Sequence, residues 1–225
     1  MDEIKYRGIM LKADDYSEYD RRCTILTAEY GKLTAFAHGA RRQGNSLSSI
    51  TQPFVMGTFQ LVPGRNAFTL RSAQISDYFL DIAMDLERTC YAAYFCDMAG
   101  YYSQEGIPAK EFLNLLYLSF KMMNSETMDK KLIRAIFEEK IICLEGEGRT
   151  SAALASERAF KNLLPFDASA AKAFDFVFAA PLQNVFRFDL TDEAKEKYIR
   201  MVKKLVETTM DVKLKSQGVL ESIVN

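Results

Sequence analysis

Two hydrophobic repeats divide the chain near residue 80. Before this point, apolar side chains recur at every second position in short stretches separated by glycine, proline and asparagine, as in half-buried strands. Beyond Asp81 the repeat lengthens to about 3.6 residues, which is typical of amphipathic helices. The change of repeat predicts an α+β protein, with a β-barrel domain over residues 1–79 and an all-α helical bundle over residues 80–225.

The first part of the chain has the pattern of five short strands. Alternating or β-branched segments occupy residues 4–12, 23–27, 33–38, 54–62 and 67–73. Tight turns are expected at Gly31 and at Pro63-Gly64, and a bulge is expected at Gly8. The polar stretch 43–49, which contains glycine, asparagine and serine, is expected to be a mobile loop. Five strands with closely spaced turns fit an OB barrel or an SH3-like barrel, and the repeat alone does not choose between them.

In the second part, the helical repeat identifies inward faces. In the first helix, the inward positions are expected at Leu86, Cys90, Tyr94, Met98 and Tyr101. Thr191 is the expected cap of the last long helix, with Asp192 and Glu193 in its first turn, where the helix dipole favours anions. The inward face of that helix is expected at Ala194, Tyr198, Met201, Val202, Leu205 and Val206. The sequence has no Pro/Ser-rich linker between the two parts, so the helical bundle is expected to follow the barrel directly.

The net charge of −1 conceals an uneven distribution. Residues 1–79 carry ten basic and eight acidic side chains, whereas residues 80–225 have a balance of −3. Between Arg21 and Arg71, seven lysines and arginines accompany one acid, Glu29. Such a segment is a candidate polyanion surface, and the alternative is that its arginines are solvated strand ends. The candidate contacts are Arg21, Arg22, Lys32, His38, Arg41, Arg42, Arg65 and Arg71.

Most catalytic patterns are missing from the sequence. His38 is the only histidine, so any Ser-His-Asp triad would have to include it, and its place beside basic residues favours a surface or phosphate contact. Gly31-Lys32 lacks the rest of a P-loop. The adjacent acids Asp14-Asp15 and Glu138-Glu139 are expected to be solvated, and the aromatic segment 91–102 is expected to pack in the core. No enzyme is predicted.

Cysteine usage and the N-terminal segment indicate the cellular setting. The four cysteines are scattered, with no Cys-x-x-Cys, and are expected to be buried and reduced. With a single histidine as the other candidate ligand, no metal and no other cofactor are expected. The first residues lack the pattern of a signal peptide, and no stretch is apolar enough to span a membrane. We therefore expect a soluble cytoplasmic protein without a membrane partner.

Several motifs resemble those of the RecO family of recombination mediators. The resemblance is densest over residues 14–54 and continues more loosely to the C-terminal part. It is carried by Asp15-Tyr16-Ser17-Glu18, Asp20-Arg21, Leu26-Thr27, Tyr30-Gly31-Lys32, Gly39-Ala40-Arg41-Arg42, Gln52-Pro53-Phe54, Ala180-Pro181-Leu182 and Leu214-Lys215-Ser216. Many family members also carry a four-cysteine zinc cluster after the third helix. Residues 148–166 contain no cysteine here, so zinc is expected to be absent.

The resemblance implies an OB barrel that binds single- and double-stranded DNA, followed by a helical domain. It implies annealing of complementary strands, partnership with RecR and single-stranded-DNA-binding protein, loading of RecA, and association with the nucleoid. The acidic, apolar-ended tail of single-stranded-DNA-binding protein is expected on the helical domain, near basic side chains such as Arg134, Lys203 and Lys204.

Arg41 and Arg42 are the expected centre of the DNA site. Arginines can hold phosphates of any sequence, and aromatic rings can stack on bases without reading them. Tyr16, Tyr19, Tyr30 and Phe36 are the stacking candidates, with Phe36 expected in the core instead. Two alternatives remain at this stage: an OB-type RNA-binding module, or a helical scaffold whose basic barrel is incidental.

Overall fold

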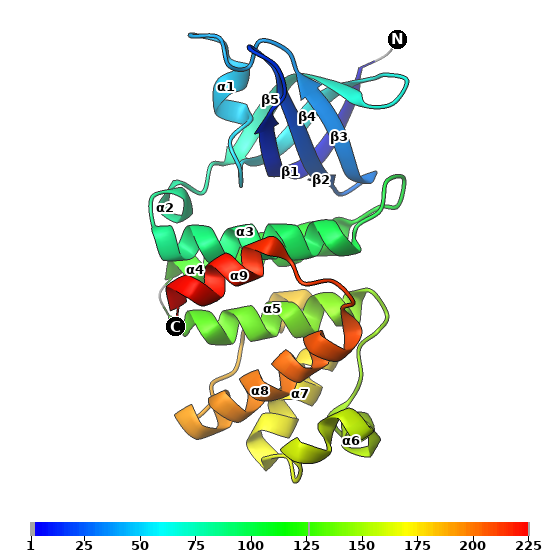
Figure 1. Cartoon of the computed structure of the whole chain (residues 1–225), viewed down its shortest axis with the longest axis vertical. Coiled ribbons are helices and arrows are strands. Elements are labelled where there is room, and N and C mark those ends of the chain that lie inside the picture. The colour runs from blue at the N-terminus through cyan, green and yellow to red at the C-terminus, as the bar shows by residue number, and fades with distance from the viewer. Residues whose placement is uncertain (1–2, 126, 225) are drawn as a thin grey trace. The chain divides into compact units, whose positions relative to one another are not determined.

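Five strands close into a barrel in the computed structural model, which describes residues 3–125 and 127–224 (Figure 1). The strands are β1 (Ile4–Asp15), β2 (Arg21–Thr27), β3 (Gly31–Ala37), β4 (Met56–Pro63) and β5 (Phe68–Asp77). Their order is β1-β2-β3-β5-β4, and β4 returns to pair with β1. The β3–β5 pairing is parallel and the others are antiparallel. This is the arrangement of an OB barrel, so the predicted fold class is confirmed.

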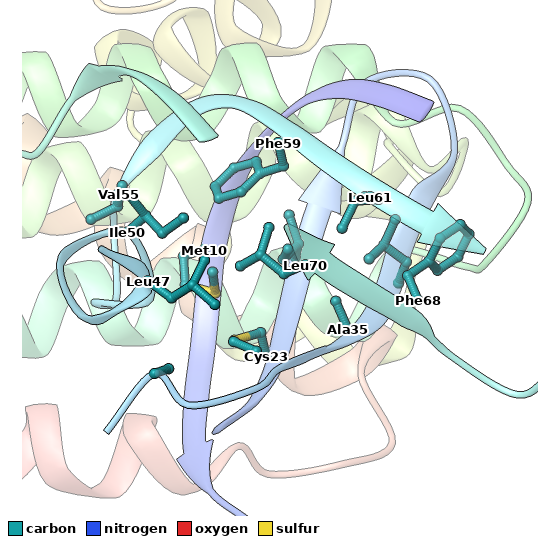
Figure 2. Packing of buried hydrophobic residues seen from close by; sticks show 14 residues of the cluster. Met10, Cys23, Ala35, Leu47, Ile50, Val55, Phe59, Leu61, Phe68 and Leu70 are labelled. Atoms are coloured by element: carbon teal, nitrogen blue, oxygen red, sulfur yellow. The ribbon is translucent and has the colours of Figure 1, made fainter. Parts of the chain in front are cut away.

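The alternation of side chains in each strand fills the barrel. In β3, Leu33, Ala35 and Ala37 are buried while the residues between them are partly exposed. Figure 2 shows the inward side chains meeting around Phe59 and Leu70. Burying aliphatic and aromatic side chains in this way supplies the main stabilisation, at about 25 cal/mol per Å² of apolar surface.

Two local expectations for the barrel are corrected. The bulge in β1 lies between Met10 and Lys12 rather than at Gly8, where a Cβ would collide with the carbonyl oxygen of Leu26. The stretch expected to be a mobile polar loop leads into a short helix, α1 (Leu47–Ile50). Leu47 and Ile50 are buried and join the barrel core, as Figure 2 shows. One helical turn is too short to reveal itself by a 3.6-residue repeat.

The rest of the chain is helical, apart from short connections. The helices are α2 (Leu80–Ala83), α3 (Leu86–Tyr102), α4 (Lys110–Ser125), α5 (Lys130–Leu144), α6 (Ser151–Ser156), η1 (Arg158–Leu163), α7 (Ala168–Ala179), η2 (Leu182–Asn184), α8 (Asp192–Thr209) and α9 (Lys215–Val224). Two compact units are formed, one by residues up to Leu116 together with those from Ser216 onward, and the other by Tyr117–Lys215. The division into domains at residues 79 and 80 stays a prediction. Within the described residues, no helix has the length and apolar character needed to cross a bilayer.

The predicted inward faces match the structure better in α8 than in α3. All six inward residues expected in α8 are buried, and Thr191 caps the helix through the Ala194 N–H. In α3, Cys90, Tyr94 and Met98 are buried as expected, but Leu86 is 70% exposed and Tyr101 is 37% exposed. Because α3 is buried on most of its circumference, its sequence carries little periodic signal.

The second unit contains a buried ionic cluster that contradicts the prediction for Glu138-Glu139. Both carboxylates are buried rather than solvated. The Tyr198 hydroxyl of α8 donates to Glu139 Oε2 at 2.7 Å, and burial raises the pKa of Glu139 well above its ordinary value. The ammonium of Lys140 donates to the carbonyl oxygens of Val177, Phe178 and Ala180 at 3.0, 3.3 and 2.6 Å. These contacts tie α5 to α7 and α8.

All four cysteines are unpaired. Cys23, Cys90 and Cys96 are buried as expected, whereas Cys143 is half-buried. Burial raises the pKa of the Cys23 and Cys143 thiols to about 12, so both are protonated at neutral pH.

Candidate nucleic-acid interface

The outer face of β2 and β3 joins an arginine to an aromatic ring. Successive side chains of a strand point to opposite faces, so the inward positions of these strands leave Arg22 and Phe36 directed outward. The two residues are opposite each other in the antiparallel β2–β3 register. Phe36 is half-buried and lies outside the barrel core, which corrects its expected place. Its alternation with Leu33, Ala35 and Ala37 is a sequence signal that would have identified this orientation.

Two further rings extend this aromatic surface. The Tyr16 ring lies 4.7 Å from that of Phe36 and tilts by 55° against it, and the His38 ring lies 6.4 Å from Phe36 in a stacked arrangement. Tyr16 is 62% exposed and is therefore available to a base. Tyr30, in contrast, packs against the barrel core with its ring between Tyr6 and Phe68. Among the stacking candidates, the outer face thus joins Tyr16 with Phe36.

The loop between β1 and β2, residues 16–20, is fastened to the segment after β3. The Asp20 carboxylate accepts the Gly39 N–H at 2.8 Å and contacts His38 Nδ1 at 3.1 Å. The Gly39 hydrogen bond, followed by that of His38, lowers the pKa of Asp20. His38 therefore contacts an acid at this surface as well as an aromatic ring, and Asp20 was named from sequence only as part of a family-like motif.

Arg41 and Arg42 meet the same loop in different ways. Arg41 Nη1 donates to the Ser17 carbonyl at 2.7 Å, and its Nη2 lies 3.1 Å from the Asp15 carboxylate. The Arg42 guanidinium lies over the Tyr19 ring, 4.7 Å from its centroid, in a cation–π contact. A guanidinium in such a contact keeps N–H groups that can bind phosphate.

Arg21 has a largely structural setting. The strand β2 begins at Arg21, two residues before its expected start, and the Arg21 side chain is half-buried. Its Nη1 donates to Thr51 Oγ1 at 3.0 Å, next to the C-terminal end of α1. Its Nε lies 3.7 Å from Asp15, the acid that also contacts Arg41. Arg21 thus connects α1 to the edge of the proposed surface.

The remaining predicted contacts lie apart from this group. Lys32, at the opposite end of the β2–β3 hairpin, donates to the Gly100 carbonyl of α3 and is half-buried. Arg65 lies in the turn between β4 and β5, and Arg71 lies on β5; both are exposed. Among the described residues, no side-chain hydrogen bond or ion pair joins these three side chains to the arginines and rings of the outer face and its loop. The structure therefore gathers Arg21, Arg22, His38, Arg41 and Arg42 from the predicted set.

The second unit contains a pocket of about 190 Å³ lined by apolar and basic side chains. Its lining includes Leu164, Phe166 and Met201 together with Lys197 and Arg200. Lys197 contacts two acids, Glu193 at 2.6 Å and Asp167 at 3.5 Å.

The three basic side chains that the sequence predicted beside a bound peptide tail do not line this pocket. Arg134 is paired with Glu138 at 2.7 Å and Lys204 with Glu207 at 3.2 Å. Lys203 is exposed. Over residues 3–125 and 127–224, no cluster of three or more His, Cys, Asp or Glu side chains has the arrangement of a metal site.

Comparison with known proteins covers both units. Residues 1–79 match the family described as Recombination protein O N terminal. DNA repair protein RecO of Clostridium kluyveri is 23% identical over 99% of this chain and 95% of its own length. DNA repair protein RecO of Clostridium perfringens is 26% identical over 98% of both chains. DNA repair protein RecO of Bacillus pumilus is 34% identical over 64% of this chain and 56% of its own.

Proposed function

Because this chain belongs to the RecO family of DNA repair and recombination proteins, we propose that it is a recombination mediator that binds single- and double-stranded DNA and anneals complementary strands. One observation carries the proposal. The outer face of β2–β3 and the adjoining loop combine aromatic rings with arginines, at Tyr16, Phe36, Arg22 and Arg42. The β2–β3 face and the β1–β2 loop of OB folds are the surfaces that commonly bind oligonucleotides.

The chemistry of this surface suits binding without sequence preference. Arginine donors neutralise phosphates, which every sequence presents, and Tyr16 offers a flat ring on which any base can stack. Duplex DNA offers the same phosphates while its bases remain paired, so the arginines can serve both forms. Annealing forms base pairs and no covalent bonds, so it requires no catalytic residue.

The proposed partners follow from the family. We propose that the protein acts with RecR on DNA covered by single-stranded-DNA-binding protein and thereby helps to load RecA. For the acidic, apolar-ended tail of single-stranded-DNA-binding protein, the pocket around Phe166 and Met201 supports a place in the second unit. The apolar residues of its lining can contact the apolar end, and the exposed Arg200 can attract the acidic part.

An annealing assay tests the proposal directly. Complementary oligonucleotides, bare or coated with single-stranded-DNA-binding protein, should anneal faster in the presence of this protein. Acceleration on coated strands should weaken when the coating protein lacks its acidic tail. No acceleration on either substrate would contradict the annealing function, and equal acceleration with and without the tail would contradict the tail contact.

A single-residue variant connects the assay to the proposed surface. Tyr16→Ala should weaken single-strand binding by about 5- to 150-fold, because stacking of one base on an aromatic ring contributes about 1–3 kcal/mol. Phe178→Ala, which removes a 37% exposed ring from the second unit, is the matched control and should bind normally. Equal binding by the two variants would exclude Tyr16 as a stacking residue. Equal competition by RNA of the same length would favour the alternative of an RNA-binding module.

A further inference from the structure

The Asp15 carboxylate lies between two arginines of the proposed DNA surface. Its Oδ2 is 3.1 Å from Arg41 Nη2, and its Oδ1 is 3.7 Å from Arg21 Nε. A phosphate group also presents two anionic oxygens to guanidinium groups in this manner. We infer that the space between Arg21 and Arg41 is a phosphate subsite for nucleic acid, and that Asp15 occupies it until a phosphate displaces the carboxylate. The inference rests on the proposed function.

The two arginines are held in place by contacts other than Asp15. Arg21 is anchored by the Thr51 hydroxyl, and Thr51 is fully buried. Arg41 Nη1 is bound by the Ser17 carbonyl, and its main-chain N–H donates to the Tyr19 carbonyl at 3.0 Å. Departure of Asp15 would therefore free Arg41 Nη2 and Arg21 Nε while both guanidinium groups keep other partners. A pre-positioned pair of arginines is what a phosphate subsite requires.

The Asp15 contacts are exposed enough to exchange. The side chain of Asp15 is 58% exposed and that of Arg41 is 36% exposed. Water screens ion pairs at such a surface, so they are weak and compete poorly with a phosphate. Asp15 is also the last residue of β1, so its side chain can turn away while the paired strand stays in place.

The carboxylate has a consequence for the activity proposed above. An arginine that already contacts a carboxylate gains less from a phosphate than a free arginine does, because it must first lose that contact. Asp15 therefore lowers DNA affinity and favours release. Release is needed by a protein that hands strands on to their complements or to another protein.

Salt-dependent binding of single-stranded DNA tests the inference. Asp15→Asn keeps the shape of the side chain and removes its charge, so a phosphate can bind Arg41 without first displacing a carboxylate. Affinity at 0.1 M salt should rise by up to about fivefold, the contribution of an exposed ion pair, and the slope of log affinity against log salt should stay the same because the number of phosphate contacts does not change. Glu18→Gln is the control, since Glu18 lies in the same loop, is exposed and forms no ion pair with any residue that the structure describes. Both variants change the net charge equally, so general electrostatic effects cancel in their comparison.

A double-mutant cycle identifies the partner of Asp15. If Asp15 restrains Arg41, the gain from Asp15→Asn should disappear in an Arg41→Ala background. The inference is overturned if Asp15→Asn binds no more tightly than Glu18→Gln, if it binds more weakly than the wild type, or if its gain survives in Arg41→Ala. If the wild type still binds DNA in these cases, only the inference about Asp15 is overturned and the proposed function stands. Failure of the wild type and all variants to bind DNA at low salt would instead overturn the proposed function, and the inference with it.

Discussion

Two groups of ionic side chains, one in the barrel and one in the second unit, lie in opposite environments. Around the β1–β2 loop, Asp15 and Arg41 are 58% and 36% exposed, and their contact is open to water. In α5, Glu139 is fully buried and Lys140 is 6% exposed. Exposed ion pairs contribute little to stability and exchange readily, whereas buried charges must be bonded throughout the folded state. The comparison teaches that the Asp15–Arg41 contact is open to exchange, whereas the contacts of Glu139 and Lys140 are part of the architecture.

Lys140 shows how a buried charge can organise a helix end. The last carbonyl groups of a helix lack partners inside it and carry a partial negative charge. The Lys140 ammonium donates to the carbonyls of Val177 and Phe178 in the last turn of α7, and to that of its cap, Ala180. Beside it, Glu139 accepts from Tyr198. Neighbouring residues of α5 thus fix the positions of two other helices.

The largest effect is expected from removing the buried ammonium. Lys140→Met should lower the free energy of unfolding by about 2–4 kcal/mol, because three carbonyl oxygens lose a charged donor in a buried site. Lys203→Met, on the exposed side of α8, should change it by less than about 0.5 kcal/mol. Urea unfolding followed by circular dichroism measures both. Equal stability of the two variants would show that Lys140 has no architectural role and would remove the contrast with the barrel.

The next effect concerns the pH dependence of stability. Burial raises the pKa of Glu139 above its ordinary value of 4.5, so above pH 4.5 the folded state retains a proton that the unfolded state has released. Stability from this group is therefore complete below pH 4.5 and is lost as pH rises toward the folded-state pKa. Glu139→Gln should remove this loss, and its stability should differ from that of the wild type by up to about 1.4 kcal/mol per pH unit in that range.

Unfolding curves between pH 4.5 and 8 measure the difference. Asp189→Asn, which alters an exposed carboxylate of the same unit, is the control and should follow the wild type. Parallel pH profiles for Glu139→Gln and the wild type would show that the buried carboxylate does not titrate differently in the two states.

The smallest change in free energy is expected from an exposed arginine of the barrel. Arg42→Ala should weaken single-strand binding about fivefold at 0.1 M salt and make the salt slope shallower by about 0.7, because one phosphate contact is lost. Its melting temperature should barely change, since surface substitutions usually alter stability by less than about 0.5 kcal/mol. Arg71→Ala, an exposed arginine outside the aromatic cluster, should have the smaller effect on DNA. A fall in melting temperature with unchanged DNA binding would assign Arg42 a structural role.

Local sequence patterns determined much of the architecture. Period-2 alternation located five strands because a strand with one buried face places every second side chain in the core. The six inward residues of α8 were predictable because one face of that helix is buried and the other is polar. The family-like motifs between residues 14 and 54 also include Arg41 and Arg42, which the sequence predicts at the centre of the DNA site.

Tertiary structure alone decided how the charged residues are used. Asp15 and Arg41 are 26 positions apart, and only closure of the β1–β2 loop against the segment after β3 brings them into contact. Glu139 and Lys140 have the composition of a solvated helix surface, yet α7 and α8 cover them. Sequence periodicity reports which face of one element is apolar, whereas the burial of a charge depends on partners supplied by distant elements. That dependence is why the same kinds of side chain became an exchangeable contact in the barrel and a fixed one in the helical unit.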